Sequence, residues 1–219
     1  MKTELSELME SRHSVRSYKP DQIEEEKREI LISLIKQINE KTGLSIQIFF
    51  DEPKCFDSFM AHYGKFKGVN NYIALVGKKS KTLDEDLGYY GEEIVLKIQE
   101  LGMNSCWVAM THGKSQARIK KGESLRCLIC FGYGENSGFP HKSKSVDQVS
   151  NYQEGMPESF LLGVKAALLA PTAINQQKFF FTLEDDGKVY LKKGMGFYTG
   201  LDLGIAKYHF EAVSGLEVS

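Results

Sequence analysis

The sequence lacks the features that mark a membrane, secreted or nucleic-acid-binding protein. None of its apolar runs is long enough to cross a bilayer, and Met1–Glu4 does not begin a signal-peptide pattern. The formal net charge is only −1, which gives no reason to expect a nucleic acid or an anionic membrane as a partner. We therefore expect a cytoplasmic globular protein.

Cysteine is scarce, with four residues and no spacing typical of a disulfide-rich secreted domain. Cys127 and Cys130 form a C-x-x-C motif, but the apolar run from Leu125 to Phe131 predicts a buried strand. The two thiols then point to different environments, no second pair completes a zinc site, and the five histidines have no metal-ligand spacing. We expect inert free thiols in a reducing cytosol rather than a metal or redox site.

The remaining composition, 42% hydrophobic and 26% charged over 219 residues, is sufficient for a sizeable core. Hydrophobic periodicity predicts alternating helices and strands, and hence a mixed fold. The predicted helices are 21–40, 84–101, 158–170 and 201–213, and the predicted strands are 45–50, 72–76, 105–110 and 127–133. Residues 137–155 are predicted to form a surface connection, and 178–192 a hairpin that turns at Asp185-Asp186-Gly187.

Two segments far apart in the chain carry the strongest functional signal. Ser11–Tyr18 offers two guanidinium groups and hydroxyls, which suit a phosphate or a flavin carbonyl. Ala170–Gln177 is a small, polar turn whose carboxamides can bind the edge of a planar heterocycle. Together they indicate one flavin site built from both ends of the chain.

A faint internal repeat runs through the sequence. Lys41–Phe50 and Pro171–Phe180 share a threonine, a glutamine and two phenylalanines, each set between an apolar helix and a strand. A Lys-Lys pair also precedes an Asp-Leu-Gly triplet at a helix start in both halves, at Asp86–Gly88 and at Asp202–Gly204. The alternative is coincidence among common residues, but the order of elements agrees as well as the letters.

These segments resemble the FMN-dependent nitroreductase family. That family has an R-x-S-x-R/K segment before an aromatic, here Arg12–Arg16 before Tyr18, and an A-P-S-x-x-N-x-Q turn, here Ala170–Gln177. Its L-G-L-G-x-C-W segment resembles Leu101–Ala109, and its G-Y/F turn resembles Phe131–Gly134. The resemblance implies an α+β nitroreductase-like fold with a central mixed or antiparallel sheet flanked by helices.

Two departures from the family pattern stand out. The small polar turn follows the Cys-Trp segment instead of preceding it, and Lys178 and Phe179 replace the usual Pro-Trp. The order is similar to that of a shorter subgroup in which one chain imitates the family's dimer. The resemblance then implies a single domain over 1–219 made of two pseudo-repeats, about 1–145 and 146–219. Such a chain is a monomer imitating a dimer, or a homodimer.

For the flavin phosphate, the resemblance implies binding by Arg12, Lys142 and Lys144, with help from the Ser14 hydroxyl. Lys142 and Lys144 belong to a basic pair ahead of an acidic helix start. The resemblance also implies that the cation of Arg16 lies near the pyrimidine edge of the flavin ring, where a positive charge favours the reduced form. The alternatives are an exposed arginine at a helix end for Arg12 and a solvated basic loop for the two lysines.

For the ring system and ribityl chain, the resemblance implies contacts with Thr172, Ala173 and Asn175, with Pro171 and Gln177 beside them. A plain helix stop is the alternative for Pro171 and Thr172, since proline ends helices without a ligand. That alternative does not account for Asn175 and the glutamines.

Three further residues come from the resemblance. The backbone amides of Ala109 and Met110 would face flavin N5, and His13 lies inside the arginine segment, where a solvated side chain is the alternative. Trp107 is more typical of a core residue than of a cofactor stack.

The activity implied is that of an FMN-dependent oxidoreductase. Hydride would come from NADH or NADPH in a ping-pong reaction, and the partner would be a small-molecule electron acceptor such as a nitroaromatic or a quinone. No acid–base side chain is required. The alternatives are a non-catalytic flavin-binding or storage protein and a degenerate scaffold of the same fold.

Overall fold

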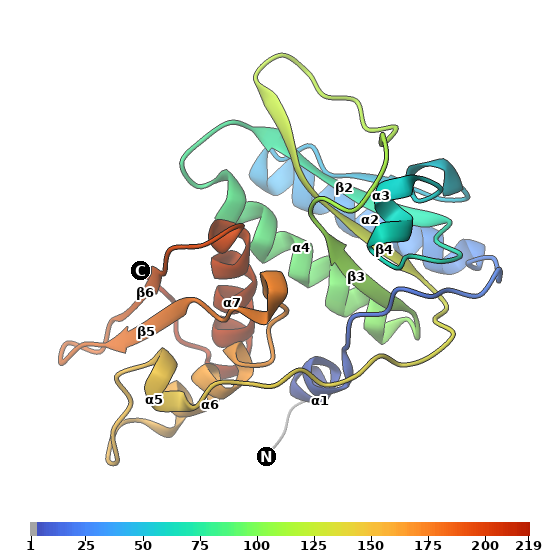
Figure 1. The fold of residues 1–219 in the computed structure, drawn as a ribbon. Helices are drawn as coiled ribbons and strands as arrows, with labels where there is room; N and C mark the ends of the chain where they lie inside the picture. Colours follow the sequence, from blue (N-terminus) through green and yellow to red (C-terminus); the bar gives the residue numbers. More distant parts are fainter. Residues whose placement is uncertain (1–3) are drawn as a thin grey trace. The chain divides into compact units, whose positions relative to one another are not determined.

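The structure is a computed structural model that describes residues 4–219 as two compact units. Unit 1 is formed by residues up to 11, by 84–93 and by 140–219; unit 2 is formed by 12–83 and 94–139. Both units combine helices with antiparallel strands (Figure 1), so the α+β prediction is confirmed. Within the described residues, none of the helices is both long and apolar enough to span a membrane.

Unit 2 is built on a four-stranded antiparallel sheet. Its strand order is β1 (Gln47–Phe49), β2 (Asn71–Lys78), β4 (Glu123–Gly132) and β3 (Asn104–Val108). The two central strands, β2 and β4, are buried along most of their length because their sequences are nearly continuous apolar runs. The unit also contains three helices and a turn: α2 (Glu25–Thr42), α3 (Phe59–Tyr63), the last part of α4 (Leu83–Glu100) and the turn η1 (Pro53–Cys55).

One face of this sheet carries a cluster of buried side chains. It takes every second residue of the strands: Tyr72, Ala74 and Val76 from β2, Cys106 and Val108 from β3, and Leu128 and Cys130 from β4. Cys127 is three residues from Cys130 and therefore faces the opposite side of the sheet. The expected separation of the two C-x-x-C thiols is confirmed, and all four cysteines are free and buried.

Unit 1 packs helices against a two-stranded hairpin. It contains α1 (Glu4–Ser11), α5 (Val146–Val149), α6 (Glu158–Ala167), α7 (Thr199–Ser214), the turn η2 (Ala173–Asn175) and strands β5 (Phe179–Leu183) and β6 (Val189–Lys193). Phe181 of the hairpin stacks on Phe210 of α7 with ring centroids 4.5 Å apart. His209 and Glu92, both fully buried, pair at 2.9 Å and tie α7 to α4. The packing of α4 against α7 thus includes a buried polar pair.

Two glycines bring α4 and α7 into backbone contact. A Cβ at Gly204 would lie 1.9 Å from the carbonyl oxygen of Glu85, and a Cβ at Gly88 would lie 2.1 Å from that of Leu201. Each glycine thus meets the carbonyl three residues before the other glycine, and each ends an Asp-Leu-Gly triplet. The two helices meet through equivalent residues, which requires glycine on both sides.

Most predicted elements are present with shifted ends. Helix α2 begins at Glu25 rather than at 21, because Glu24 is still extended, and it ends where Gly43 adopts a left-handed conformation (φ 72°). Strand β4 begins at Glu123 rather than at 127. The predicted hairpin, β5–β6, is confirmed, and the predicted connection 137–155 contains the four-residue helix α5.

The glycine contact predicts that Gly204→Ala lowers the free energy of unfolding. Helix propensity alone would favour alanine by about 1 kcal/mol, but the added methyl group overlaps the Glu85 carbonyl, and overpacking costs about 1–3 kcal/mol or more. Urea unfolding followed by circular dichroism measures the net loss.

Ala212→Gly, at an exposed position of the same helix, serves as the control and should show only the propensity cost of about 1 kcal/mol. A Gly204→Ala protein at least as stable as the unmutated one would show that the helices do not approach this closely.

Candidate functional site

The arginine segment lies along the edge of the sheet in unit 2. Ser14 forms a parallel bridge with Ser105 of β3, and the Val15 N–H donates to the Ser105 carbonyl at 3.0 Å. The Tyr18 N–H donates to the Lys67 carbonyl at 2.9 Å. Because alternate residues of an extended segment face opposite sides, Val15 is buried while its neighbour Ser14 is exposed. The sheet edge therefore fixes which side chains of this segment face outward.

The two arginines of this segment have different surroundings. Arg16 is exposed, with its guanidinium 5.5 Å from the centre of the Phe66 ring and its Nη1 donating to the Gly64 carbonyl at 3.4 Å. Arg12 is only 3% exposed, so the alternative of an exposed arginine at a helix end is wrong. His13 is half-buried, and a Cβ at Gly138 would lie 2.7 Å from its own Cβ.

Ala109 and Met110 follow directly after β3, the strand that carries the arginine segment on its edge. Ala109 is half-buried and the Met110 side chain is 67% exposed. They therefore belong to the same unit as the arginines. Both residues lie in a bend, so their backbone is outside the strand.

A pair of thiols lies beneath the arginine segment. The thiol of Cys130 donates to the Cys106 carbonyl at 3.6 Å, and the Cys106 thiol donates to the Trp107 carbonyl at 3.5 Å. The neighbouring Cys130 thiol, Arg16 and the Ser14 hydroxyl lower the pKa of Cys106 against the opposing effect of burial. Burial raises the pKa of Cys130. Cys106 was matched to the family only as part of a motif, and nothing in the spacing of residues 106 and 130 predicts that they meet.

In unit 1, the turn from Pro171 to Gln177 has a strained backbone. Ile174, Asn175 and Gln177 have φ values of 48°, 55° and 44°. Residues other than glycine rarely adopt this left-handed conformation, and such strain persists only where surrounding contacts enforce it. The contacts that enforce it come from two buried side chains.

Gln177, 1% exposed, is the first of these side chains. Its Oε1 accepts from the Lys144 N–H at 2.8 Å, and its Nε2 donates to the Lys142 carbonyl at 3.2 Å and to Asn175 Oδ1 at 2.9 Å. Its own N–H donates to Thr172 Oγ1 at 3.1 Å, and its carbonyl accepts from Lys144 Nζ at 2.8 Å. Gln177 thus joins the turn to the basic segment around Lys142.

Asp202, buried near the start of α7, is the second. Its Oδ1 accepts from the Ala173 N–H at 2.9 Å, and its Oδ2 accepts from Gln176 Nε2 at 2.7 Å. Burial raises the pKa of Asp202 to about 6, and the two hydrogen bonds limit that rise. The sequence pattern identified Asp202 only as part of a repeated triplet, so its role in holding the turn was missed.

The predicted site residues therefore fall into two groups, one in each unit. Unit 2 contains Arg12, His13, Ser14, Arg16, Ala109 and Met110. Unit 1 contains Lys142, Lys144, Pro171, Thr172, Ala173, Asn175 and Gln177. The structure brings the second group together through direct hydrogen bonds, and the prediction that both groups bind one flavin stays a prediction.

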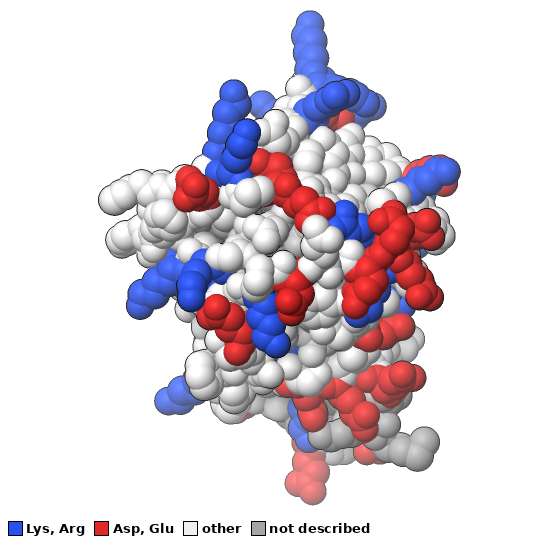
Figure 2. Space-filling view, turned by 90° about the vertical axis from the view of Figure 1, so that its right-hand side faces the viewer, with Lys and Arg blue, Asp and Glu red and all other residues white. Residues whose placement is uncertain are grey.

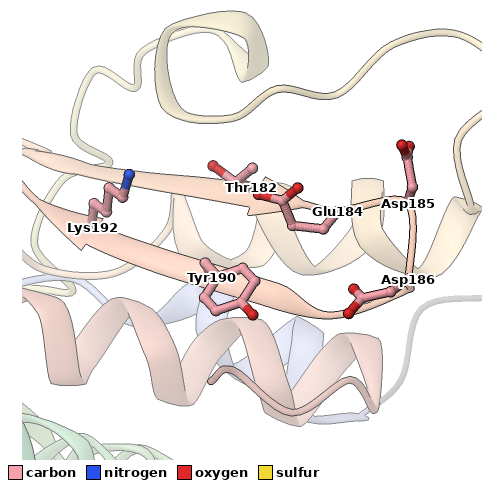
Figure 3. A pocket seen from close by; sticks show the side chains of 6 residues that line it. All are labelled: Thr182, Glu184, Asp185, Asp186, Tyr190 and Lys192. Carbon is pink, nitrogen blue, oxygen red and sulfur yellow. The ribbon is translucent and has the colours of Figure 1, made fainter.

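A separate hollow lies on the β5–β6 hairpin and contains none of these residues. It has a volume of about 540 Å³ and is lined by Thr182, Glu184, Asp185, Asp186, Tyr190 and Lys192 (Figure 3). Three of its six lining side chains are carboxylates, which would repel a phosphate. On the molecular face shown in Figure 2, positive and negative side chains lie among one another. Within the described residues, no group of three side chains could hold a metal ion.

The raised pKa of Asp202 predicts a pH-dependent contribution to stability. Because the folded protein holds this proton up to about pH 6 while an unfolded aspartate releases it near pH 3.9, the contribution is full below about pH 4 and is lost as the pH rises to about 6. Asp202→Asn cannot ionise, so its stability relative to the unmutated protein should rise over this interval by on the order of 3 kcal/mol.

Urea unfolding at pH values from 4 to 7 measures this difference. Asp147→Asn, at an exposed carboxylate of α5, is the matched control and should follow the unmutated protein. Parallel stability profiles for Asp202→Asn and the unmutated protein would contradict the assignment of a buried, weakly acidic Asp202.

A family model described as "Putative TM nitroreductase" matches residues 4–214. Among solved structures, a "putative nitroreductase" from Thermotoga maritima has a TM-score of 0.70 at 22% identity, covering 99% of this chain and 88% of that chain. A "putative nitroreductase in complex with FMN" from Desulfovibrio desulfuricans has a TM-score of 0.55 at 14% identity, covering 72% and 100%.

A "Putative NADH dehydrogenase/NAD(P)H nitroreductase" from Bacteroides thetaiotaomicron has a TM-score of 0.54 at 17% identity, covering 68% of this chain and 97% of that chain. At these identities the three structures show a shared fold. No curated protein matches this chain significantly.

Proposed function

The chain belongs to the nitroreductase family whose model matches residues 4–214, and from this we propose that it binds FMN and works as an NAD(P)H-dependent oxidoreductase. The family match carries the proposal because it includes both the arginine segment and the turn from Pro171 to Gln177. The names of the solved structures with this fold, one of them an FMN complex, support the same cofactor and reductant.

The residues of the turn fit a planar ligand that carries a phosphate. Lys142 and Lys144 are exposed cations beside the turn, and burying a phosphate requires charge-assisted partners. Thr172 Oγ1 accepts the Gln177 N–H, which leaves its hydroxyl hydrogen for an acceptor on a ligand. Asn175 donates one N–H to the Lys142 carbonyl at 2.8 Å and retains its second.

Within this group, we assign Gln177 and Asp202 to positioning and the others to contact. Every polar group of the Gln177 side chain bonds within the turn and the basic segment. The Ala173 N–H is taken by Asp202, so Ala173 would meet a flavin through its methyl group, beside Pro171. A flavin supplies two-electron chemistry when bound, so the protein's task is to orient it and set its electrostatics.

In the arginine segment, Arg16 is the residue proposed to act on the electronics of the ring. It is exposed, its guanidinium contacts the Gly64 carbonyl and the Phe66 ring, and it is always charged. A fixed cation stabilises negative charge on the reduced ring. We propose that Arg12 and Ser14 contact the phosphate, that the amides of Ala109 and Met110 approach the ring, and that His13 lies beside them.

We further propose that the chain imitates a dimer of its longer relatives. The contact between α4 and α7 supports this, because Gly88 and Gly204 meet each other's helix through equivalent carbonyls, as two-fold-related helices do. The chain also repeats one order of elements, a helix followed by two antiparallel strands and a second helix. This order occurs as α2–β1–β2–α4, with α3 inserted, and again as α6–β5–β6–α7.

Arg16→Ala is expected to weaken FMN binding at least 10-fold, since a hydrogen bond to a charged group contributes about 1.5–3 kcal/mol. Quenching of FMN fluorescence during titration with protein measures the dissociation constant. Arg118→Ala removes an exposed arginine of the same unit and serves as the control. Equal affinities for the Arg16 and Arg118 variants would reject the role of Arg16.

The catalytic part of the proposal predicts that NADH or NADPH bleaches the flavin absorbance of the FMN-loaded protein under anaerobic conditions within seconds. Subsequent addition of a quinone or nitroaromatic should restore the absorbance. Bleaching that takes many minutes would support a flavin-storage protein instead. Protein that takes up no FMN would support a scaffold without a cofactor.

A further inference from the structure

Two cysteines from different parts of the sequence meet inside unit 2. Cys106 of β3 and Cys130 of β4 are direct partners in the antiparallel register and lie on the same face of the sheet. Opposite residues of such a pair have Cβ atoms about 4.5–5.5 Å apart, and a disulfide requires about 3.5–4.5 Å. A small local approach of the two side chains is therefore enough to join them.

The surroundings give the two sulfur atoms different roles. The Cys106 sulfur lies beside the Cys130 thiol, Arg16 and the Ser14 hydroxyl, all of which favour its ionised form. Cys130 stays protonated because it is completely buried; its sulfur lies 3.5 Å from the Tyr18 hydroxyl and 3.6 Å from the Cys106 carbonyl. One cysteine is thus a nucleophile and the other a thiol placed to resolve its oxidised form.

We propose that Cys106 and Cys130 form a thiol–disulfide redox site that reduces hydrogen peroxide or another small hydroperoxide. The Cys106 thiolate attacks one peroxide oxygen, the O–O bond breaks, and hydroxide leaves as Cys106 becomes a sulfenic acid. The Cys130 sulfur then attacks the Cys106 sulfur, the S–O bond breaks, and the departing hydroxyl takes the Cys130 proton as water. Two electrons pass from the two sulfur atoms to the peroxide, and one disulfide forms.

The size of the oxidant follows from burial. Cys106 is 3% exposed and Cys130 is fully buried, so a bulky disulfide reagent cannot reach either sulfur, whereas a peroxide is close in size to water. The product is reversible for a related reason. Directly opposite positions on adjacent strands leave little freedom to reach relaxed disulfide geometry, and strained disulfides are readily reduced by dithiols.

The other two cysteines do not share this environment. Cys127 completes the C-x-x-C motif, but it faces the opposite side of the sheet from Cys130. Burial raises the pKa of Cys55 to about 12, so its thiol is not ionised at neutral pH. The sequence motif therefore indicates the wrong pair, and the strand register identifies the pair that can react. The thiol reaction depends on no bound cofactor, but Arg16 and Ser14, which lie beside Cys106, are also the residues proposed to contact the flavin.

The test exposes the reduced full-length protein to hydrogen peroxide, removes the peroxide with catalase, and alkylates the remaining thiols after denaturation. Two of the four thiols should be lost, with the loss of two hydrogen atoms in the intact mass, and dithiothreitol should restore both. Trypsin should release residues 98–114 linked to residues 127–142, and fragmentation of the second peptide should locate the bond at Cys130.

Two variants make a matched pair. Cys127→Ala should retain the link, whereas Cys130→Ala should abolish it and leave a sulfenic acid on Cys106 that dimedone traps. Four alkylatable thiols after peroxide treatment, a link to Cys55 or Cys127, or a link that persists in Cys130→Ala would each overturn the proposal. If Cys130→Ala does not fold, the peptide map of the unmutated protein decides alone.

Discussion

The turn from Pro171 to Gln177 depends on two buried side chains that satisfy its backbone. Three residues of this turn have positive φ values, a conformation that costs free energy at each position. Gln177 and Asp202 offset that cost by bonding to backbone and side-chain groups on both sides of the turn. The exposed groups beside them, those of Lys142 and Lys144, therefore extend from a rigid base, as a binding site for a planar anion requires.

The sequence predicted the elements that have strong periodicity and clear stops. Helix α2 ends at Gly43 and the β5–β6 hairpin turns at its Asp-Asp-Gly sequence, because glycine conformations and turn residues act locally. Helices α1 and α3 were missed, since a helix of eight residues or fewer presents too little periodicity and gains its stability from packing. The start of β4 was misjudged because Glu123 and Ser124, which are polar and lie outside the apolar run, continue the pairing with β2.

The candidate site shows the same contrast between features set by local sequence and features set by contacts between distant residues. The motifs identified the residues that a family resemblance can carry, including Arg12, whose burial no local pattern indicates. The contact between Asp202 and the turn was not predicted, and Gln177 was predicted to lie beside the ligand rather than to join the turn to Lys144. Asp202 reaches Ala173 across 29 positions and Gln177 reaches Lys144 across 33, so no local pattern shows these bonds. The same limit hid the pairing of Cys106 with Cys130, which arises from strand register, whereas the visible C-x-x-C motif joins residues on opposite faces.

The segment from Ser14 to Tyr18 has a second consequence that concerns solubility. By pairing with Ser105, it occupies the open hydrogen-bonding edge of β3, and free strand edges are the usual templates for association between chains. The segment proposed to bind the cofactor thus also shields the edge strand of the sheet. Detachment of this segment would leave β3 able to pair with another molecule, so substitutions that loosen it are expected to promote association between chains.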